Sequence, residues 1–211
     1  MFIYKQLNMS IIYLTHNDFY IQNKQNDGNF SATGVTEPVK LCNKLKGLSL
    51  VYFSSNQCSF CDIFQPIFEQ LPKAIGGCYF AIINVSNNNQ IVKASANSTT
   101  PIKYVPYLLL YFSGVPFMRY DGVRDLNSIK TFIFEVASRL QQNSIPSAGN
   151  SIRGASMGRQ LGAINETQQQ MNHHMRKDDD VNSRNIPTYA AGKPKKTKDV
   201  CFLTLDEAYN S

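Results

Sequence analysis

The 211-residue chain contains no tryptophan, only three histidines and no apolar run near the roughly 18 residues that a membrane-spanning helix needs. Its first residues, MFIYKQLNMSIIYL, have one lysine and no long apolar stretch before a small-residue cleavage site, so we expect no secretory signal. Paired carboxylates, a nucleophilic serine with a partner histidine and a phosphate-binding glycine loop are also missing. These absences argue against a membrane protein and against those enzyme classes. They favour an intracellular protein, in which structural disulfides are rare.

The positive charge of the chain does not indicate a nucleic-acid partner. The formal net charge is +6, but lysine and arginine residues are spread along the sequence. The tight cluster KPKKTK, residues 193–198, has no interleaved aromatic residues of the kind that stack on bases. We therefore interpret the charge as a solubility feature and expect neither a nucleic acid nor a membrane as partner.

Composition divides the chain near residue 141. Residues 1–140 contain apolar blocks separated by turn signals, after a short extension at residues 1–9, and we expect them to form one domain. Residues 141–211 are polar and of low complexity, so we expect an extended tail. The tail ends in VCFLTLDEAYN, which is apolar again. This end therefore frays, docks on a partner protein assembly or docks back on the domain.

Hydrophobic patterns predict alternating strands and helices in the domain. Strands are expected at residues 10–15, 48–54, 78–86, 106–113 and 116–122, and helices at residues 36–47, 61–75, 88–96 and 125–142. Pro66 should kink the second helix. Early alternation indicates parallel strands and the late strand–turn–strand unit adds antiparallel ones. The sequence thus predicts an α/β fold with a central mixed β-sheet flanked by helices.

Two cysteines in SNQCSFCDIF stand where the second strand gives way to a helix. Cys58 lies at the expected helix start, where free backbone N–H groups and the helix dipole favour a thiolate. One helical turn brings Cys61 close enough for a disulfide. Cys58 is therefore a candidate nucleophile, and Cys61 is a candidate for the thiol that resolves a mixed disulfide.

Several stretches in order resemble the thioredoxin-fold superfamily. YFSSNQCSFCDIFQPIFEQLP is followed by YVPYLLLYFSGVPFMRYDGVRDLNSIKTFI, and the resemblance covers about residues 10–140. The hairpin residues Tyr120, Gly122 and Arg124 are most similar to protein-disulfide-isomerase-type members. This resemblance implies a thioredoxin-like fold and a redox-active disulfide at Cys58 and Cys61, with no bound cofactor or metal.

The resemblance also implies where a substrate binds. Val105 and Pro106 match the family's loop, whose cis-proline faces the active-site disulfide, and Val105 would offer its backbone to an extended substrate strand. Ser59 and Phe60, between the cysteines, would contact the substrate. The expected substrate-binding residues are thus Ser59, Phe60, Val105 and Pro106.

Three positions depart from the family pattern. Gln57 precedes the first cysteine where members usually carry tryptophan, and Tyr52 stands where thioredoxins have a buried aspartate that moves protons at the resolving thiol. Ser59-Phe60 is neither Gly-Pro nor Gly-His, and without histidine between the cysteines strong oxidant character has no obvious source. Slow turnover as a reductase is the expected consequence.

Other interpretations of the five cysteines remain open. Cys58 and Cys61 could form half of a zinc site, which normally has four ligands, or could be structural. Cys42 and Cys78 are expected to be buried core residues. Cys201, in the tail, could pair with another chain, although we expect a free thiol.

Two functional hypotheses follow. The first is an intracellular thiol–disulfide oxidoreductase that acts on protein thiols and disulfides. The second is a structural or scaffolding protein that uses the domain and its tail to bind partners, for example a minor capsid or virion protein of a large DNA virus. The long tail and the departures at Gln57 and Tyr52 favour the second, and the abundant asparagine, as in SNNNQ, is compatible with an AT-rich viral genome.

Overall fold

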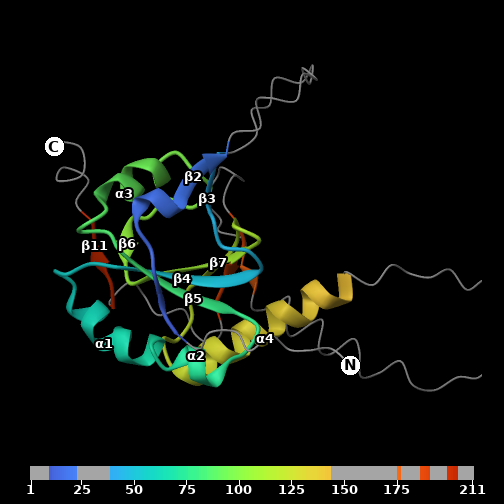
Figure 1. Cartoon of the computed structure of the whole chain (residues 1–211). Coiled ribbons are helices and arrows are strands. Elements are labelled where there is room, and N and C mark those ends of the chain that lie inside the picture. Colours follow the sequence, from blue (N-terminus) through green and yellow to red (C-terminus); the bar gives the residue numbers. More distant parts are fainter. Residues whose placement is uncertain (1–9, 23–38, 144–174, 177–185, 191–198, 204–211) are drawn as a thin grey trace, which may run out of the picture.

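The computed structural model describes residues 10–22, 39–143, 175–176, 186–190 and 199–203, which are drawn in colour in Figure 1. The expected extension at residues 1–9 and the basic cluster at residues 193–198 lie outside these ranges. Three segments of the expected tail lie within them, and each forms a short strand. These three strands are where the structure adds most to the sequence analysis.

A seven-stranded mixed sheet forms the centre of the molecule (Figure 1). Its strand order is β1-β5-β4-β7-β8-β10-β9. The pairs β1–β5, β5–β4 and β8–β10 are parallel, whereas β4–β7, β7–β8 and β10–β9 are antiparallel. The strands are β1 Ile12–Tyr13, β4 Leu48–Ser54, β5 Tyr79–Asn84, β7 Tyr107–Phe112, β8 Val115–Tyr120, β9 Met175–Arg176 and β10 Thr188–Tyr189.

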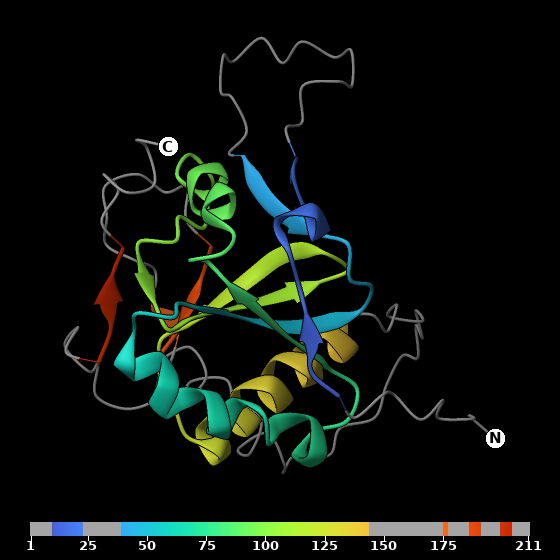
Figure 2. The ribbon, with the colours of Figure 1, turned by 60° about the vertical axis from the view of Figure 1, so that its left-hand side comes forward.

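Helices cover both faces of this sheet. Figure 2 shows α1, α2 and α4 together on one side, and α3 with the paired strands β2 (Phe19–Gln22) and β3 (Lys40–Asn43) on the other. The helices are α1 Ser59–Phe68, α2 Leu71–Ala74, α3 Asn89–Ser95 and α4 Leu126–Asn143, and a short 3₁₀ helix spans His16–Asp18. The prediction of a thioredoxin-like α/β fold with a mixed central sheet is confirmed.

The apolar run of β4 places this strand at the centre of the core. Every residue from Ser49 to Ser54 is buried, as expected for a strand that is covered on both faces. Tyr52 lies in an aromatic cluster, with its ring centroid 5.1 Å from those of Phe64 and Phe68 on α1. This packing fixes α1 against the sheet and so determines where the helix begins.

The prediction of a helix at residues 36–47 is wrong. Residues Lys40–Asn43 form β3, which pairs antiparallel with β2 Phe19–Gln22. Asn43 also donates its backbone N–H to the carbonyl of Gly114, in the β7–β8 turn, at 2.8 Å. Gly114 has a φ of 81°, and a side chain there would collide with the Asn43 backbone. These partners are distant in sequence, so the local pattern did not reveal them.

The prolyl break in the second predicted helix is displaced by a few residues. Pro66 lies within α1, which ends at Phe68, and Glu69 and Gln70 separate it from α2. Since proline lacks the N–H that would bond to the preceding turn, it weakens the helix just before this end. The predicted single kinked helix is therefore two helices.

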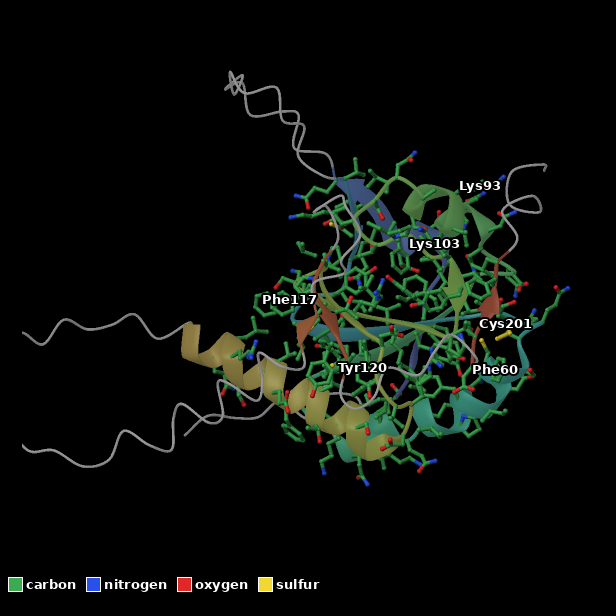
Figure 3. All side chains as sticks on the ribbon, turned by 180° about the vertical axis from the view of Figure 1, so that it is seen from behind. Phe60, Lys93, Lys103, Phe117, Tyr120 and Cys201 are labelled. Atoms are coloured by element: carbon green, nitrogen blue, oxygen red, sulfur yellow. A yellow bond between two sulfur atoms is a disulfide. The ribbon has the colours of Figure 1, made fainter. Side chains whose placement is uncertain are left out.

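Two strands from the C-terminal part of the chain extend the sheet, and β10 is the one that pairs with β8. Thr188 and Tyr189 of β10 are buried, and Tyr189 packs with ring centroids 4.7 Å from Phe132 of α4 and 5.9 Å from Tyr120 of β8. Figure 3 places Tyr120 between the sheet and α4. The Tyr189 hydroxyl donates to Glu135 Oε2 at 3.0 Å. Thr188 and Tyr189 thus contribute to the core, although they lie in the stretch expected to be an extended tail.

Candidate active site

The start of α1 holds the predicted nucleophile. Cys58 is the N-cap residue, with extended backbone angles, and its carbonyl accepts hydrogen bonds from the N–H groups of Cys61 at 2.8 Å and Asp62 at 3.2 Å. Its side chain makes no capping hydrogen bond. At this position the free N–H groups of the first helical turn would stabilise a Cys58 thiolate.

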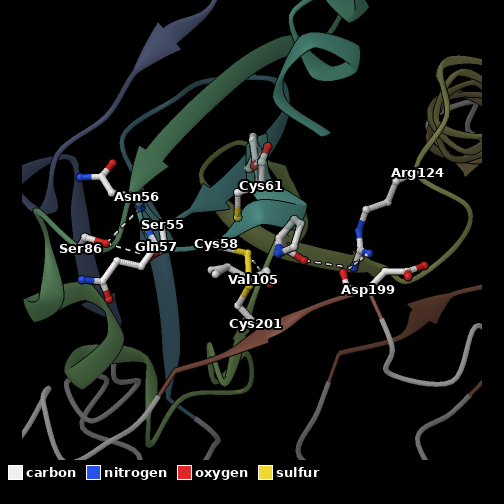
Figure 4. The surroundings of a disulfide bond; sticks show 12 residues. Ser55, Asn56, Gln57, Cys58, Cys61, Ser86, Val105, Arg124, Asp199 and Cys201 are labelled. Atoms are coloured by element: carbon white, nitrogen blue, oxygen red, sulfur yellow. Dashed lines mark hydrogen bonds between the residues drawn. A yellow bond between two sulfur atoms is a disulfide. The ribbon is translucent and has the colours of Figure 1, made fainter. Parts of the chain in front are cut away.

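Cys58 is disulfide-bonded to Cys201, with a Cα–Cα distance of 5.8 Å across 143 residues of sequence. The expectation of a free Cys201 thiol is therefore wrong, and the expected disulfide with Cys61 is not the one formed here. Figure 4 shows this bond at the centre of the site, with the Cys61 sulfur pointing toward it. Cys61 carries a buried thiol. The structure thus brings together three cysteines where the sequence analysis expected two.

Cys201 reaches Cys58 as part of an added β-strand. The strand β11, Cys201–Phe202, pairs antiparallel with β6, Tyr104–Val105, so that Cys201 lies opposite Val105. The peptide bond between Val105 and Pro106 is cis, as the family resemblance implies. Cys58 Sγ lies 3.5 Å from the Val105 carbonyl oxygen. The backbone of Val105 therefore receives an extended, cysteine-bearing segment of the chain.

Arg124 joins the docked segment to the loop that contains the cis-proline. Its Nη1 donates to the backbone carbonyl of Asp199 at 3.0 Å, and its Nη2 donates to the carbonyl of Pro106 at 3.2 Å (Figure 4). Both acceptors are backbone atoms, so this contact can hold a peptide of any side-chain sequence. The guanidinium fork suits such a two-acceptor arrangement better than a lysine would.

The buried environment of Cys61 disfavours its thiolate. Burial is the main cause that raises the pKa of Cys61, and the Asp62 carboxylate raises it further. Hydrogen bonds from the Ser55 backbone and the Tyr52 hydroxyl act in the opposite direction, as does the charge of Arg124. Tyr52 also donates to the Cys61 carbonyl at 3.2 Å. A tyrosine hydroxyl thus stands beside the Cys61 thiol, at the position where the family resemblance implies a carboxylate.

The two residues between the cysteines differ in their surroundings. Ser59 is exposed, whereas Phe60 is half-buried and lines a cavity of about 330 Å³ beside α1. Arg124, Asp199 and Val200 line the same cavity. A second cavity, of about 300 Å³, lies on the other side of β11 and is lined by Val105 and Phe202. These cavities, here called the first and second cavity, flank the docked strand.

The remaining cysteines lie in the core. Cys42 and Cys78 are both buried, as expected, and burial raises the pKa of each thiol, to about 12 for Cys78. Cys42 Sγ donates to Gln22 Oε1 at 3.3 Å. Within the described ranges, no group of three or more histidine, cysteine, aspartate or glutamate side chains could hold a metal ion.

Sequence reasoning missed two residues of this site. Arg124 belongs to the hairpin that resembles the family, but its contacts with the Asp199 and Pro106 carbonyls are not predictable from that resemblance. Cys201 is separated from Cys58 by most of the chain. The available signal for Cys201 was the return of apolar residues around it, in VCFL, after a polar spacer. That signal favours docking, but it does not say where the segment docks.

Comparison with known proteins identifies the class of the domain. Residues 37–135 match the family model described as Thioredoxin, in agreement with the thioredoxin-like fold of this part of the chain. The match includes Cys58, Cys61, Val105, Pro106 and Arg124.

Two similar proteins come from iridescent viruses. Uncharacterized protein 196R of Invertebrate iridescent virus 6 is 29% identical over 162 residues, which cover 77% of this chain and 74% of that protein. Uncharacterized protein 020R of Invertebrate iridescent virus 3 is 29% identical over 165 residues, which cover 76% and 78%. Among solved structures, a mutant thioredoxin from Halobacterium salinarum matches with a TM-score of 0.41 and 19% identity, covering 60% of this chain and 90% of that one.

The helices of the described part of the chain do not include a candidate membrane span, because none is both long and apolar enough.

Proposed function

We propose that this protein is a thiol–disulfide oxidoreductase whose substrates are cysteine-bearing segments of other proteins. Cys58 acts as the nucleophile and Cys61 as the resolving thiol. One observation carries the proposal: an extended strand paired with Val105 presents a cysteine within bonding distance of Cys58. A substrate cysteine on an equivalent strand would reach the same sulfur.

Disulfide exchange at this site balances without any bound cofactor. When the substrate holds a disulfide, the Cys58 thiolate attacks one substrate sulfur, a mixed disulfide forms and the second substrate sulfur leaves as a thiolate. The Cys61 thiolate then attacks Cys58, and the first substrate sulfur leaves and takes up a proton. The substrate gains two electrons and the cysteine pair loses two. With a substrate dithiol and an oxidised pair, the same steps run in reverse.

The surrounding residues have separate roles in this mechanism. The first turn of α1 stabilises the Cys58 thiolate, and the Val105 backbone holds the substrate as an added strand. Pro106 sets the position of Val105 beside Cys58. Phe60 lines the first cavity and provides an apolar surface for the substrate. Ser59, the neighbouring residue, is exposed and can contact the substrate from solvent.

Replacement of the nucleophile tests the proposal. Cys58→Ser removes the attacking sulfur, so we expect insulin disulfides to be reduced no faster than by dithiothreitol alone, which is the electron donor in this assay. Cys42→Ser is the matched control, because Cys42 is a buried thiol outside the site, and it should retain activity. Circular dichroism confirms that both variants are folded. Equal activity of the folded Cys58→Ser variant and the wild type would contradict the function.

The viral relatives favour a second candidate role, as a packaged or scaffolding component of a virus particle. In this proposal the protein acts inside the infected cell and is then carried in the particle. Mass spectrometry of gradient-purified, protease-treated particles tests it. Recovery at a fixed ratio to the capsid protein supports packaging, and confinement to the cell lysate contradicts it. The enzymatic proposal does not depend on this result.

A further inference from the structure

Residues 199–203 occupy the position that the proposed mechanism gives to a substrate. In β11, Cys201 lies opposite Val105 and Phe202 lies opposite Tyr104. The pairing continues at Leu203, whose N–H donates to the Lys103 carbonyl at 3.0 Å. The segment thus extends along β6 as an added strand, which is a common mode of peptide binding.

Side chains on both sides of Cys201 meet the walls of the site. Val200, before the cysteine, lines the first cavity together with Phe60 and Ile63 of α1. Phe202, after the cysteine, packs edge-on against Tyr104 with ring centroids 6.2 Å apart and remains 64% exposed. The residue before the cysteine is therefore the more enclosed of the two.

We propose that residues 199–203 are an internal substrate of this site and that Cys201 is a third redox-active cysteine. This inference rests on the proposed function. In the closed form, Cys58 is bonded to Cys201, and both Cys58 and Cys61 are buried. In the open form, Cys58 is bonded to Cys61, and β11 leaves Val105 available to another protein.

The closed and open forms interconvert by one internal exchange. The Cys61 thiolate attacks Cys58, the Cys58–Cys61 bond forms as the Cys58–Cys201 bond breaks, and Cys201 leaves as a thiolate that takes up a proton. Cys61 has lost one proton and Cys201 has gained one, so no external oxidant or reductant is needed. Cys61 is positioned for this attack because its side chain lies one helical turn from Cys58 and points toward the disulfide (Figure 4).

The internal substrate also defines a class of external substrates. It is an extended segment with an aliphatic residue directly before the cysteine, as Val200 precedes Cys201. Arg124 holds the backbone carbonyl two residues before the cysteine and so adds no side-chain preference. Figure 3 shows Phe60 and Cys201 at the same end of the molecule, where this selection takes place.

Disulfide mapping of the full chain tests the closed form. Protein purified without reductant is alkylated at low pH, digested and analysed by mass spectrometry. We expect Cys58–Cys201 as the main disulfide of the wild type and of Cys61→Ser, and Cys58–Cys61 in Cys201→Ser. Cys42→Ser is the control and should match the wild type. A wild type that contains mainly Cys58–Cys61 would overturn the proposal.

A single-turnover assay separates this proposal from the proposed function. Each oxidised protein is mixed with a fluorescent peptide dithiol, and the rate of peptide oxidation is measured. Cys201→Ser should react at least about ten-fold faster than the wild type, since the segment is no longer covalently held beside Val105. Equal, Cys58-dependent rates would overturn the internal substrate and leave the function standing. Rates no higher than that of Cys58→Ser in every variant would overturn both.

A peptide of the docked sequence tests the substrate class. The peptide DVCFL, residues 199–203, is reacted in reduced form with oxidised Cys201→Ser, and the mixed disulfide with Cys58 is trapped by acid. Replacing its valine by aspartate should slow trapping about ten-fold, because a carboxylate would take the place of an aliphatic side chain beside Phe60 and Ile63 in the first cavity. Replacing its phenylalanine by alanine should have a smaller effect. Equal rates for the valine and aspartate peptides would overturn the predicted preference.

Discussion

The strands β10 and β11 both return from the C-terminal part of the chain, yet they are held in different ways. Tyr189 of β10 is 3% exposed and packs between aromatic rings of β8 and α4. Phe202 of β11 is 64% exposed and, among the described residues, has one ring neighbour, Tyr104. β10 is stabilised by burial, whereas β11 is stabilised by a reducible covalent bond and a few backbone hydrogen bonds.

This difference assigns the two segments to different tasks. Apolar burial is always present in the folded protein, so β10 is a permanent strand of the sheet, between β8 and β9. A disulfide can be exchanged without unfolding the domain, so β11 can leave while β10 stays. The chain between them, residues 191–198, joins a structural segment to an exchangeable one.

The largest expected effect is on stability and falls on β10. Tyr189→Ala removes a buried ring and its hydrogen bond to Glu135, so we expect the free energy of unfolding to fall by about 3 kcal/mol. Phe202→Ala, the matched aromatic truncation on β11, should change it by less than about 0.5 kcal/mol. Urea unfolding followed by circular dichroism measures both. Similar losses in the two variants would contradict the distinction between the strands.

Reduction should release β11 and leave β10 in place. The amide of Leu203 donates to Lys103 in the β11 pairing, and the amide of Asp121 donates to Tyr189 in the β10 pairing. After dithiothreitol treatment we expect exchange at Leu203 to accelerate about 30-fold or more, because a covalent constraint of about 2 kcal/mol or more is lost. Exchange at Asp121 should not change. Hydrogen exchange by NMR reads both amides in one sample, and equal acceleration would show that the strands leave together.

The sequence predicted the parts of the fold whose determinants are local. The apolar runs at residues 48–54 and 106–113, and the periodic helix at residues 125–142, all correspond to observed elements. The prediction failed at residues 36–47, where β3 pairs with β2 and its last residue, Asn43, bonds to Gly114 of the β7–β8 turn. A two-residue strand such as β10 has too little pattern to be recognised without its neighbours.

The candidate site divides in the same way. The sequence placed Cys58 and Cys61 at a helix start, and Val105-Pro106 in a loop, because the order of strand and helix and the motif resemblance can both be recognised from the amino-acid sequence. It assigned Cys201 a free thiol because its partner depends on the path of the chain over a sequence separation of 143 residues. The contact of Arg124 with Asp199 depends on the same path. The closed form of the site could therefore be recognised only in three dimensions.

Arg124 should determine how readily β11 leaves. Arg124→Gln weakens donation to the Asp199 and Pro106 carbonyls, and a hydrogen bond from a charged group contributes about 1.5 kcal/mol, so dithiothreitol should release Cys201 about ten-fold faster. Arg124→Lys keeps the charge but lacks the two-pronged geometry and should give an intermediate rate. Lys130→Gln removes an exposed charge from α4 and is the control. Release is followed by time-resolved alkylation, and an unchanged rate in Arg124→Gln would exclude this role.

The smallest expected effect concerns Tyr52, which stands beside the resolving thiol. Burial raises the pKa of Tyr52 well above the neutral range, so its hydroxyl remains a donor and helps to stabilise the Cys61 thiolate. Tyr52→Phe removes that donor while Asp62 and Arg124 remain, so the pKa of Cys61 should rise further and less thiolate should be present at a given pH. We expect the exchange of Cys201 for Cys61 to slow about three-fold, since one hydrogen bond contributes less than about 1 kcal/mol here. The curve of this exchange rate against pH should shift to alkaline pH.

Tyr111→Phe is the control. It removes another buried hydroxyl, which has no hydrogen-bond partner within the described ranges, and should leave the curve in place. A shift in Tyr111→Phe as large as that in Tyr52→Phe would mean that the hydroxyl acts through packing and not through the thiol.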